Sequence, residues 1–477
     1  MKRSSGVLMH ISAIWGEYSE GSFGAEALEW IDFLADSGFK VWQVLPYCLP
    51  DENNSPYKSF SAFSGNPFFI DLPTLYKDGL ITAAELEAAK QKTPYACEFS
   101  RLHKERYLLL KKASMRVKDK DEIINFMKDY PHTDNFCKFM ALKEANEDKE
   151  WMEWTADVPD ADTLFAWQFI QYTFIKQWSK VKKYANDKGI SIVGDIPIYV
   201  ALDSSDVWSC PDQFQLDEEY KPINVAGCPP DYFSEDGQLW GNPLYDWDKM
   251  KADGFSWWKD RMKFMCELFD GVRIDHFRGL ESYYSIPATE KTARNGKWVK
   301  GPGMDLVNAL KEVCDDKLII AEDLGDITNE VRELVSESGF PGMRILQFAF
   351  LGDEGSPHIP HNYDNNSIAY TGTHDNNTLL GYIWEMEGWQ RRRLFEYCGY
   401  FGDDWDASYE AIMRTMFQSH AGLVIFPVQD LLFYGSDTRF NTPGRGEGNW
   451  SYRLTKEQLN LIDKNRIRSW IDLYGRK

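Results

Sequence analysis

A (β/α)8 barrel with helical and loop insertions between its strands is the α/β fold that this sequence predicts. Eight short apolar runs follow one another along the chain, and helix-like segments separate most of them. Three of the runs end in an acidic residue, and the open rim of an α/β barrel is where polar strand ends gather. The chain has 477 residues, of which 43% are hydrophobic, so one large core is possible.

The predicted strands are short β-branched or apolar runs, which are typical of buried parallel strands. They comprise residues 40–46, 67–72 and 190–197, the runs that begin at residues 271, 318 and 368, and residues 343–350 and 421–430. Residues 25–37 and 164–186 have helical patterns. Residues 7–14 are interpreted as a first buried segment, because this stretch is too short and too interrupted for a signal peptide.

Two connections are too long to be single helices, although we expect residues 1–477 to form one catalytic barrel. Residues 73–163 are rich in Lys and Glu and have a helical pattern, which predicts a helical insertion subdomain. Residues 198–269 contain a turn-rich stretch around Pro229 and Pro230. Loops of this length inside a compact fold are usually functional.

The composition restricts the classes of partner and the compartment. A net charge of −21 would repel a polyanion, so nucleic acid is not expected as a partner. No apolar stretch approaches the length of a membrane span, and none of the eight cysteines has CxxC spacing. We therefore expect a cytoplasmic protein with reduced thiols. Aromatic residues make up 15% of the chain, and most of these rings are expected in the core.

The acidic strand ends predict a catalytic carboxylate cluster made of Asp275, Glu322 and Asp375. Arg273 shares a strand face with Asp275 and favours its ionised form, as a nucleophile at an anomeric carbon requires. Glu322 ends an apolar strand, where desolvation would raise its pKa as a general acid requires. Asp375 follows His374 and would brace an oxocarbenium-like transition state. Two carboxylates about 5 Å apart give a retaining double displacement.

These and other motifs also have structural interpretations. Arg273, Asp275 and Arg278 could form a structural ion-pair network without catalysis, although three acidic strand ends in one chain favour a site. His358 and His361 have the HxxH spacing of zinc ligands but no third ligand nearby, so we interpret them as loop residues. The glycine-rich residues 444–448 follow no strand and lack the Lys-Ser/Thr of a phosphate loop.

Several longer motifs, spread over nearly the whole chain, carry a family resemblance. They are residues 4–8, 42–46, 55–57, 59–67, 194–200, 229–233, 239–245, the three carboxylate runs, 441–444 and 448–450. In these motifs the chain resembles the 4-α-glucanotransferases, also called amylomaltases or disproportionating enzymes, which are related to the α-amylase clan. The departures lie in residues 16–24 and 51–54 and at Leu202 and Cys228, and they affect the expected chain-length preference rather than the chemistry.

The resemblance implies roles for individual residues. It implies that Asp275 is the nucleophile, Glu322 the acid/base and Asp375 the stabiliser of the transition state. Substrate contacts are implied for the following residues, of which Tyr232 and Phe233 belong to a lid on the acceptor side: Ser55, Tyr57, Asp203, Tyr232, Phe233, Trp240, Arg273, His276, His374 and Asn441.

The resemblance also implies a reaction and its partners. We expect transfer of α-1,4-glucan segments from a maltodextrin donor to a sugar acceptor by a monomer or homodimer, without metal or organic cofactor. Two alternatives stay open. One is an α-glucan hydrolase of the same clan, and the other is a glucan-binding protein without activity.

Overall fold

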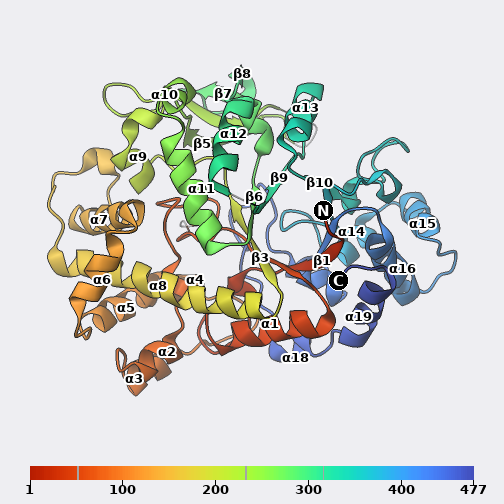
Figure 1. The fold of residues 1–477 in the computed structure, drawn as a ribbon, viewed down its shortest axis with the longest axis horizontal. Coiled ribbons are helices and arrows are strands. Elements are labelled where there is room, and N and C mark those ends of the chain that lie inside the picture. The colour runs from red at the N-terminus through yellow and green to blue at the C-terminus, as the bar shows by residue number, and fades with distance from the viewer. Residues whose placement is uncertain (51–52, 231–233, 315) are drawn as a thin grey trace.

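The computed structural model describes residues 1–50, 53–230, 234–314 and 316–477, and its centre is a closed barrel of eight parallel strands (Figure 1). Around the barrel, the strands follow their order in the chain. They are β1 (Ser4–Leu8), β2 (Val41–Gln43), β3 (Ser191–Ile196), β6 (Gly271–Ile274), β9 (Leu318–Ala321), β10 (Gly342–Ile345), β11 (Ser367–Tyr370) and β12 (Leu423–Pro427). The predicted fold class is confirmed.

The barrel interior is a packed core, as in other barrels of this kind. Apolar side chains from successive strands meet there, among them Leu8, Val193, Ile320, Met343 and Ile425, all of them at most 1% exposed. The outer faces of the strands are also buried beneath helices, which explains why the strand sequences are apolar without alternation.

The prediction of a strand at residues 67–72 is wrong. Residues Pro67–Phe69 form a 3-10 helix instead, and α2 (Leu72–Lys77) begins directly after Asp71. Asn66 and Asp71 each cap one of these helices by accepting a hydrogen bond from a backbone N–H, at 2.9 and 2.8 Å. The strand that completes the eight is β1, which begins three residues before the buried segment expected at 7–14.

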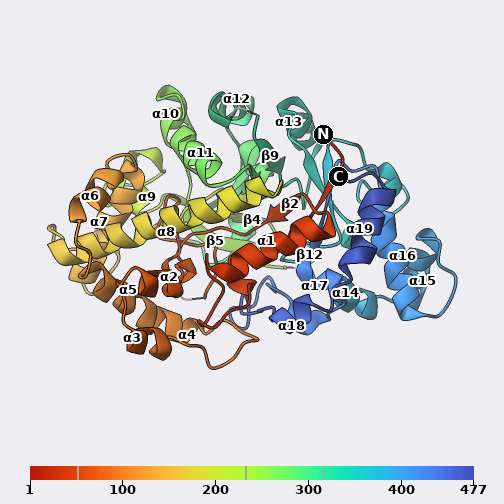
Figure 2. The same cartoon turned by 60° about the horizontal axis from the view of Figure 1, so that its bottom comes forward.

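Helices surround the barrel (Figure 2). They are α1 (Ala25–Ser37), α8 (Ala161–Asp187), α11 (Ser256–Leu268), α12 (Gly303–Cys314), α13 (Asn329–Ser338), α14 (Leu379–Glu385), α15 (Gly388–Tyr397), α16 (Trp405–Gln418), α17 (Val428–Leu431), α18 (Lys456–Leu459) and α19 (Lys464–Leu473). Helix α8 has 27 residues and extends beyond the barrel to the far left of both views. Its buried Gln171 and Gln177 accept hydrogen bonds from the backbone N–H groups of Gly65 and Asp71, both at 2.7 Å.

The segment between β2 and β3 contains a group of helices that pack on the outer part of α8. After α2 come α3 (Ala83–Ala88), α4 (Phe99–Arg101), α5 (Tyr107–Ser114), α6 (Lys120–Met127) and α7 (Pro131–Ala145), with a π-helical turn at Leu102–Arg106 joining α4 to α5. Figures 1 and 2 show α5, α6 and α7 on the side of the molecule opposite α15.

A second, antiparallel sheet that the sequence did not predict lies beside the barrel, with the strand order β5–β4–β7–β8. Its members are β4 (Asn224–Cys228), β5 (Gln238–Pro243), β7 (Ser282–Pro287) and β8 (Lys297–Lys300). Two short helices, α9 (Ser205–Ser209) and α10 (Trp247–Ala252), flank β4 and β5 in the chain. The sheet therefore combines the 198–269 connection with the connection that follows β6.

The barrel closes where β1 pairs with β12, from Ser4 opposite Leu423 to Leu8 opposite Pro427. The fully buried guanidinium of Arg476 secures this seam by donating hydrogen bonds to the carbonyl oxygens of Ser4 and Ala421, both at 3.0 Å. The two marked chain ends consequently lie side by side (Figure 1). None of the described helices combines the length and apolarity that crossing a bilayer requires.

Candidate active site

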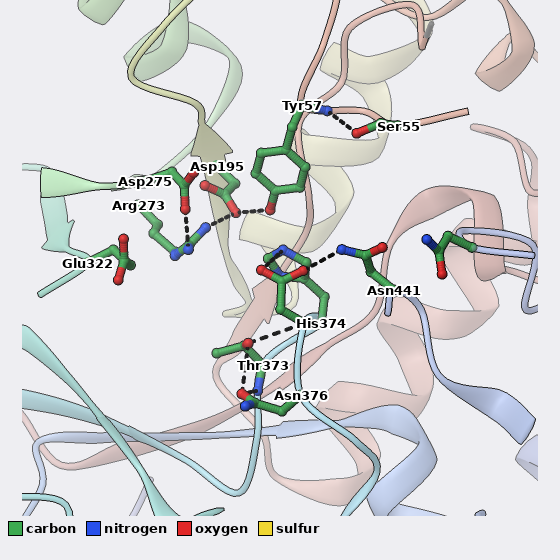
Figure 3. Close-up of polar contacts among 12 residues, drawn as sticks. Ser55, Tyr57, Asp195, Arg273, Asp275, Glu322, Thr373, His374, Asn376 and Asn441 are labelled. Carbon is green, nitrogen blue, oxygen red and sulfur yellow. Dashed lines mark hydrogen bonds and ion pairs between the residues drawn. The ribbon is translucent and has the colours of Figure 1, made fainter. Parts of the chain in front are cut away.

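The three acidic residues follow the carboxyl ends of three parallel strands and so lie at one mouth of the barrel. Asp275 comes directly after β6, and Glu322 comes directly after β9, with which β6 pairs. Asp375 lies in the loop that follows β11. Figure 3 shows Asp275 and Glu322 beside the guanidinium of Arg273. This mouth is where barrels of this class carry their chemistry.

Arg273 lies at the centre of the polar cluster. Its Nη1 donates to Asp195 Oδ2 at 2.5 Å, and its Nη2 donates to Asp275 Oδ1 at 2.6 Å. Burial opposes the charge of this guanidinium, but Asp195 and Asp275, with a smaller contribution from Glu322, raise its pKa well above the usual value. Because the cation is fixed between Asp195 and Asp275, it holds the Asp275 carboxylate in one orientation.

The carboxyl group of Glu322 is strongly desolvated. Its residue is only 8% exposed, and burial together with the neighbouring charge of Asp275 raises its pKa from 4.5 to about 8. Two backbone N–H groups hold it, that of His276 to Oε2 at 2.7 Å and that of Leu324 to Oε1 at 2.8 Å. Near neutral pH this group is able both to give and to take a proton.

Asp375 has the opposite electrostatic environment. Partial desolvation would raise its pKa, although the side chain is about half exposed, but the charge of His374 and hydrogen bonds from His374 and Asn441 lower the pKa below the usual range. Asn441 Nδ2 donates to Oδ1 at 2.6 Å, and His374 Nε2 lies 3.3 Å from Oδ2. The site thus pairs one carboxyl group that is protonated near neutral pH with one that is always ionised, the pattern that separates acid and anion roles.

Aromatic rings form one wall of the site. The Tyr57 ring stacks on His374 with centroids 5.1 Å apart, and Trp450 lies 5.9 Å from both rings. The Tyr57 hydroxyl donates to Asp195 Oδ2 at 2.8 Å, which ties this wall to the Arg273 cluster (Figure 3).

His276 follows Asp275 in the chain, and its ring contacts a further aromatic residue, Trp240. The backbone of His276 has a φ of 53°, a left-handed conformation that is uncommon for residues other than glycine and tends to occur at functional sites. Burial lowers the pKa of its imidazole to about 4, so the ring is neutral at physiological pH. The edge of the ring meets Trp240, with centroids 5.1 Å apart, and its Nε2 has no partner among the described residues.

The other predicted contact residues differ in position. Ser55 Oγ accepts from the backbone N–H of Tyr57 at 3.3 Å, which places it beside the aromatic wall. Asp203 pairs with Lys143 at 2.5 Å and, together with Trp240, lines a cavity of about 620 Å³. The lid residues Tyr232 and Phe233 lie outside the described part of the chain.

Two residues of the site were not among the predicted site residues. Asp195 lay inside the predicted strand 190–197 and a family motif, and an acidic residue within a buried strand, β3, is a signal that would have identified it. Trp450 is 7% exposed and reaches the site from a loop after β12, and it was recognised only as part of the family motif at 448–450.

The residues that resembled metal ligands have other contacts. His358 Nδ1 accepts from the backbone N–H of Ile345 at 3.1 Å, and His361 Nδ1 lies 3.1 Å from the Tyr397 hydroxyl. Within the described ranges, no group of three or more His, Cys, Asp or Glu side chains is arranged to hold a metal ion.

Comparison with known proteins identifies the family of the chain. The family model described as 4-alpha-glucanotransferase matches residues 9–459. The chain belongs to the 4-alpha-glucanotransferase family. Among similar members of this family, the 4-alpha-glucanotransferase of Streptococcus pneumoniae is 44% identical over 100% of this chain and 98% of its own length, and that of Clostridium butyricum is 42% identical over 98% and 100%. A solved structure, amylomaltase from Streptococcus agalactiae in complex with acarbose, superposes with a TM-score of 0.95 at 36% identity over the whole of both chains.

Proposed function

We propose that this protein transfers α-1,4-glucan segments from one maltodextrin to another, or to glucose, as a retaining 4-α-glucanotransferase. The observation that carries the proposal is the arrangement of Glu322 and Asp275 around Arg273, with a raised pKa at Glu322 and a fixed carboxylate at Asp275. The family to which the chain belongs supports the same reaction.

In the first half-reaction, Glu322 donates its proton to the glycosidic oxygen while an Asp275 oxygen attacks the anomeric carbon. The C–O bond to the departing sugar breaks, and an ester bond to Asp275 forms. The sugar leaves with the Glu322 proton, so Glu322 becomes a carboxylate.

In the second half-reaction, the Glu322 carboxylate takes the proton of an acceptor hydroxyl, whose oxygen attacks the same carbon and releases Asp275. Two inversions at one carbon give net retention. Asp375 stays ionised and stabilises the positive charge that develops on the sugar ring in both transition states.

Several polar donors and rings would hold the glucan. The unpartnered Nε2 of His276 is available to a sugar hydroxyl, and Asn441, His374 and Tyr57 line the same side of the site as Asp375. We assign Ser55, Asp203 and Trp240 to substrate contacts further along the chain of sugars. Tyr232 and Phe233 are assigned to a lid on the acceptor side, which would exclude water and favour transfer over hydrolysis.

The organisation of the chain fits this activity. We propose one catalytic barrel that carries a helical subdomain at residues 73–163 and a lid-bearing insertion at residues 198–269. A reducing, cytoplasmic location is supported by the buried thiols Cys97 and Cys137, which form no disulfide.

Incubation with maltotriose tests the reaction. Transfer predicts glucose together with a ladder of longer maltodextrins, whereas glucose and maltose alone would indicate a hydrolase. The absence of any turnover would indicate a binding protein.

The Asp275→Asn variant tests the nucleophile. It should lose nearly all turnover and still bind maltodextrin in calorimetry, because binding contacts are spread over many groups. An active Asp275→Asn variant would refute the assignment.

A further inference from the structure

A groove between α15 and α16 is lined by aromatic side chains and lies at the edge of the molecule. Its volume is about 370 Å³, which lies within the range of small-ligand sites. Its rings are those of Phe395, Tyr400, Phe401 and Trp405. Figures 1 and 2 show α15 and α16 on the outer flank of the barrel, on the side opposite α5, α6 and α7.

Two of these rings are exposed to an extent that is unusual for their size. The side chain of Phe401 is 82% exposed and that of Trp405 is 43% exposed. The Trp405 ring is nevertheless fixed, because the Arg391 guanidinium lies 5.4 Å from its centre and the Phe395 ring packs on it nearly at right angles, with ring centroids 6.2 Å apart. Contiguous exposed apolar patches often mark interaction sites or ligand-binding grooves.

Charged side chains without ion-pair partners surround the rings. Arg392, Glu396 and Asp403 line the groove together with Arg391, which packs on Trp405, and within the described part of the chain none of the four forms an ion pair. Positive and negative groups are nearly balanced here, so the groove does not select for a charged ligand. Unpaired donors and acceptors around exposed rings instead suit a neutral ligand that has many hydroxyl groups and flat apolar faces.

We propose that this groove binds a segment of an α-glucan chain outside the catalytic centre. The choice of glucan rests on the proposed function, since the polymer on which the enzyme acts carries these hydroxyls and ring faces along its whole length. The net charge of −21 also disfavours an anionic polymer as the occupant.

Such a site would act by raising the local concentration of substrate. A long glucan held in the groove has other segments close to the catalytic mouth, so its second contact becomes intramolecular. Maltotriose is too short to gain from this effect. The groove should therefore affect the apparent KM for long glucans and leave the kinetics of short ones unchanged.

The test compares the double variant Phe401→Ala/Trp405→Ala with the parent in native gels that contain amylopectin. We expect the dissociation constant for amylopectin to rise about ten-fold, as for loss of an aromatic anchor. The apparent KM for amylose should rise several-fold, while turnover of maltotriose stays at the parent rate.

Two further variants serve as controls, one for rings outside the groove and one for a folding defect. Trp389→Ala removes a ring on α15 that is 63% exposed but does not line the groove, and it should behave as the parent. Phe401→Ala alone removes a loop side chain with little packing, so a folding defect cannot explain its effect.

The proposal would be overturned if amylopectin retarded the double variant as strongly as the parent, or if Trp389→Ala weakened amylopectin binding as much as the double variant does. It would also be overturned if light scattering showed that the parent is a dimer and the double variant a monomer. Failure of the parent to disproportionate maltotriose would instead count against the proposed function, and the gel assay would still report on the groove.

Discussion

Replacing Glu322 by Gln should lower the stability of the protein at acidic pH and raise it at alkaline pH. The folded pKa of this carboxyl group is about 8, compared with 4.5 as its ordinary value. Between these two pH values the folded state keeps a proton that the unfolded state releases. Stability from this group is therefore complete below pH 4.5 and is lost as the pH rises to about 8.

The size of the effect follows from that difference. At about 1.4 kcal/mol per pKa unit, ionising Glu322 in the folded state costs about 5 kcal/mol, which is an upper value because local relaxation reduces it. A Gln side chain avoids this cost. However, the NH2 group of the Gln side chain would face one of the backbone N–H groups that donate to Glu322 in the parent. That N–H group would lose its acceptor, which costs about 1–3 kcal/mol of stability.

We therefore expect Glu322→Gln to be about 2–4 kcal/mol more stable than the parent at pH 9, and about 1–3 kcal/mol less stable at pH 4.5. Urea denaturation of both proteins at pH 4.5, 7 and 9 measures this difference. Asp375→Asn is the matched control, because the lowered pKa of Asp375 means that its charge stabilises the fold. That variant should be destabilised at pH 7 and at pH 9.

A stability difference between the parent and Glu322→Gln that is equal at pH 4.5 and pH 9 would refute this reasoning. Such a result would mean that Glu322 has an ordinary pKa in the folded protein, and the acid/base assignment would lose its physical basis.

Two further predictions follow from local contacts. Asn441→Ala removes the hydrogen-bond donor that lies 2.6 Å from Asp375, so the pKa of Asp375 should rise. The acid limb of the pH–rate profile on maltotriose should then move to higher pH. An acid limb at the same pH as in the parent would show that this contact does not lower the pKa of Asp375. Gly194→Ala places a Cβ 2.4 Å from the Phe269 ring and should cost about 1–3 kcal/mol in urea denaturation, whereas Gly446→Ala, which has open space around it, should cost nothing comparable.

The sequence alone predicted the features whose signals are local. Helix α1 occupies the predicted residues 25–37, and each of the three acidic residues follows a barrel strand. A buried parallel strand is a continuous apolar run, and a polar residue at its end is visible without knowledge of the fold.

Features that depend on distant contacts were not predictable in this way. Residues 67–72 are apolar because they are buried, but their conformation is set by caps and by hydrogen bonds to Gln171 and Gln177, which lie about a hundred residues later in the chain. A short apolar run does not distinguish a strand from a buried helical turn. Similarly, Trp450 belongs to the site only because its loop folds back onto Tyr57.

The seam between β1 and β12 has a consequence for biosynthesis. During translation, β2 is synthesised soon after β1 and can pair with one edge of β1. The other edge of β1 stays unpaired until residues 423–427 of β12 have been synthesised. An unsatisfied strand edge invites pairing with other polypeptides. Chaperone dependence during translation should therefore concentrate on the period before the last barrel strand emerges. A circular permutation that places the chain ends between two other barrel strands would leave a different strand edge unpaired during translation.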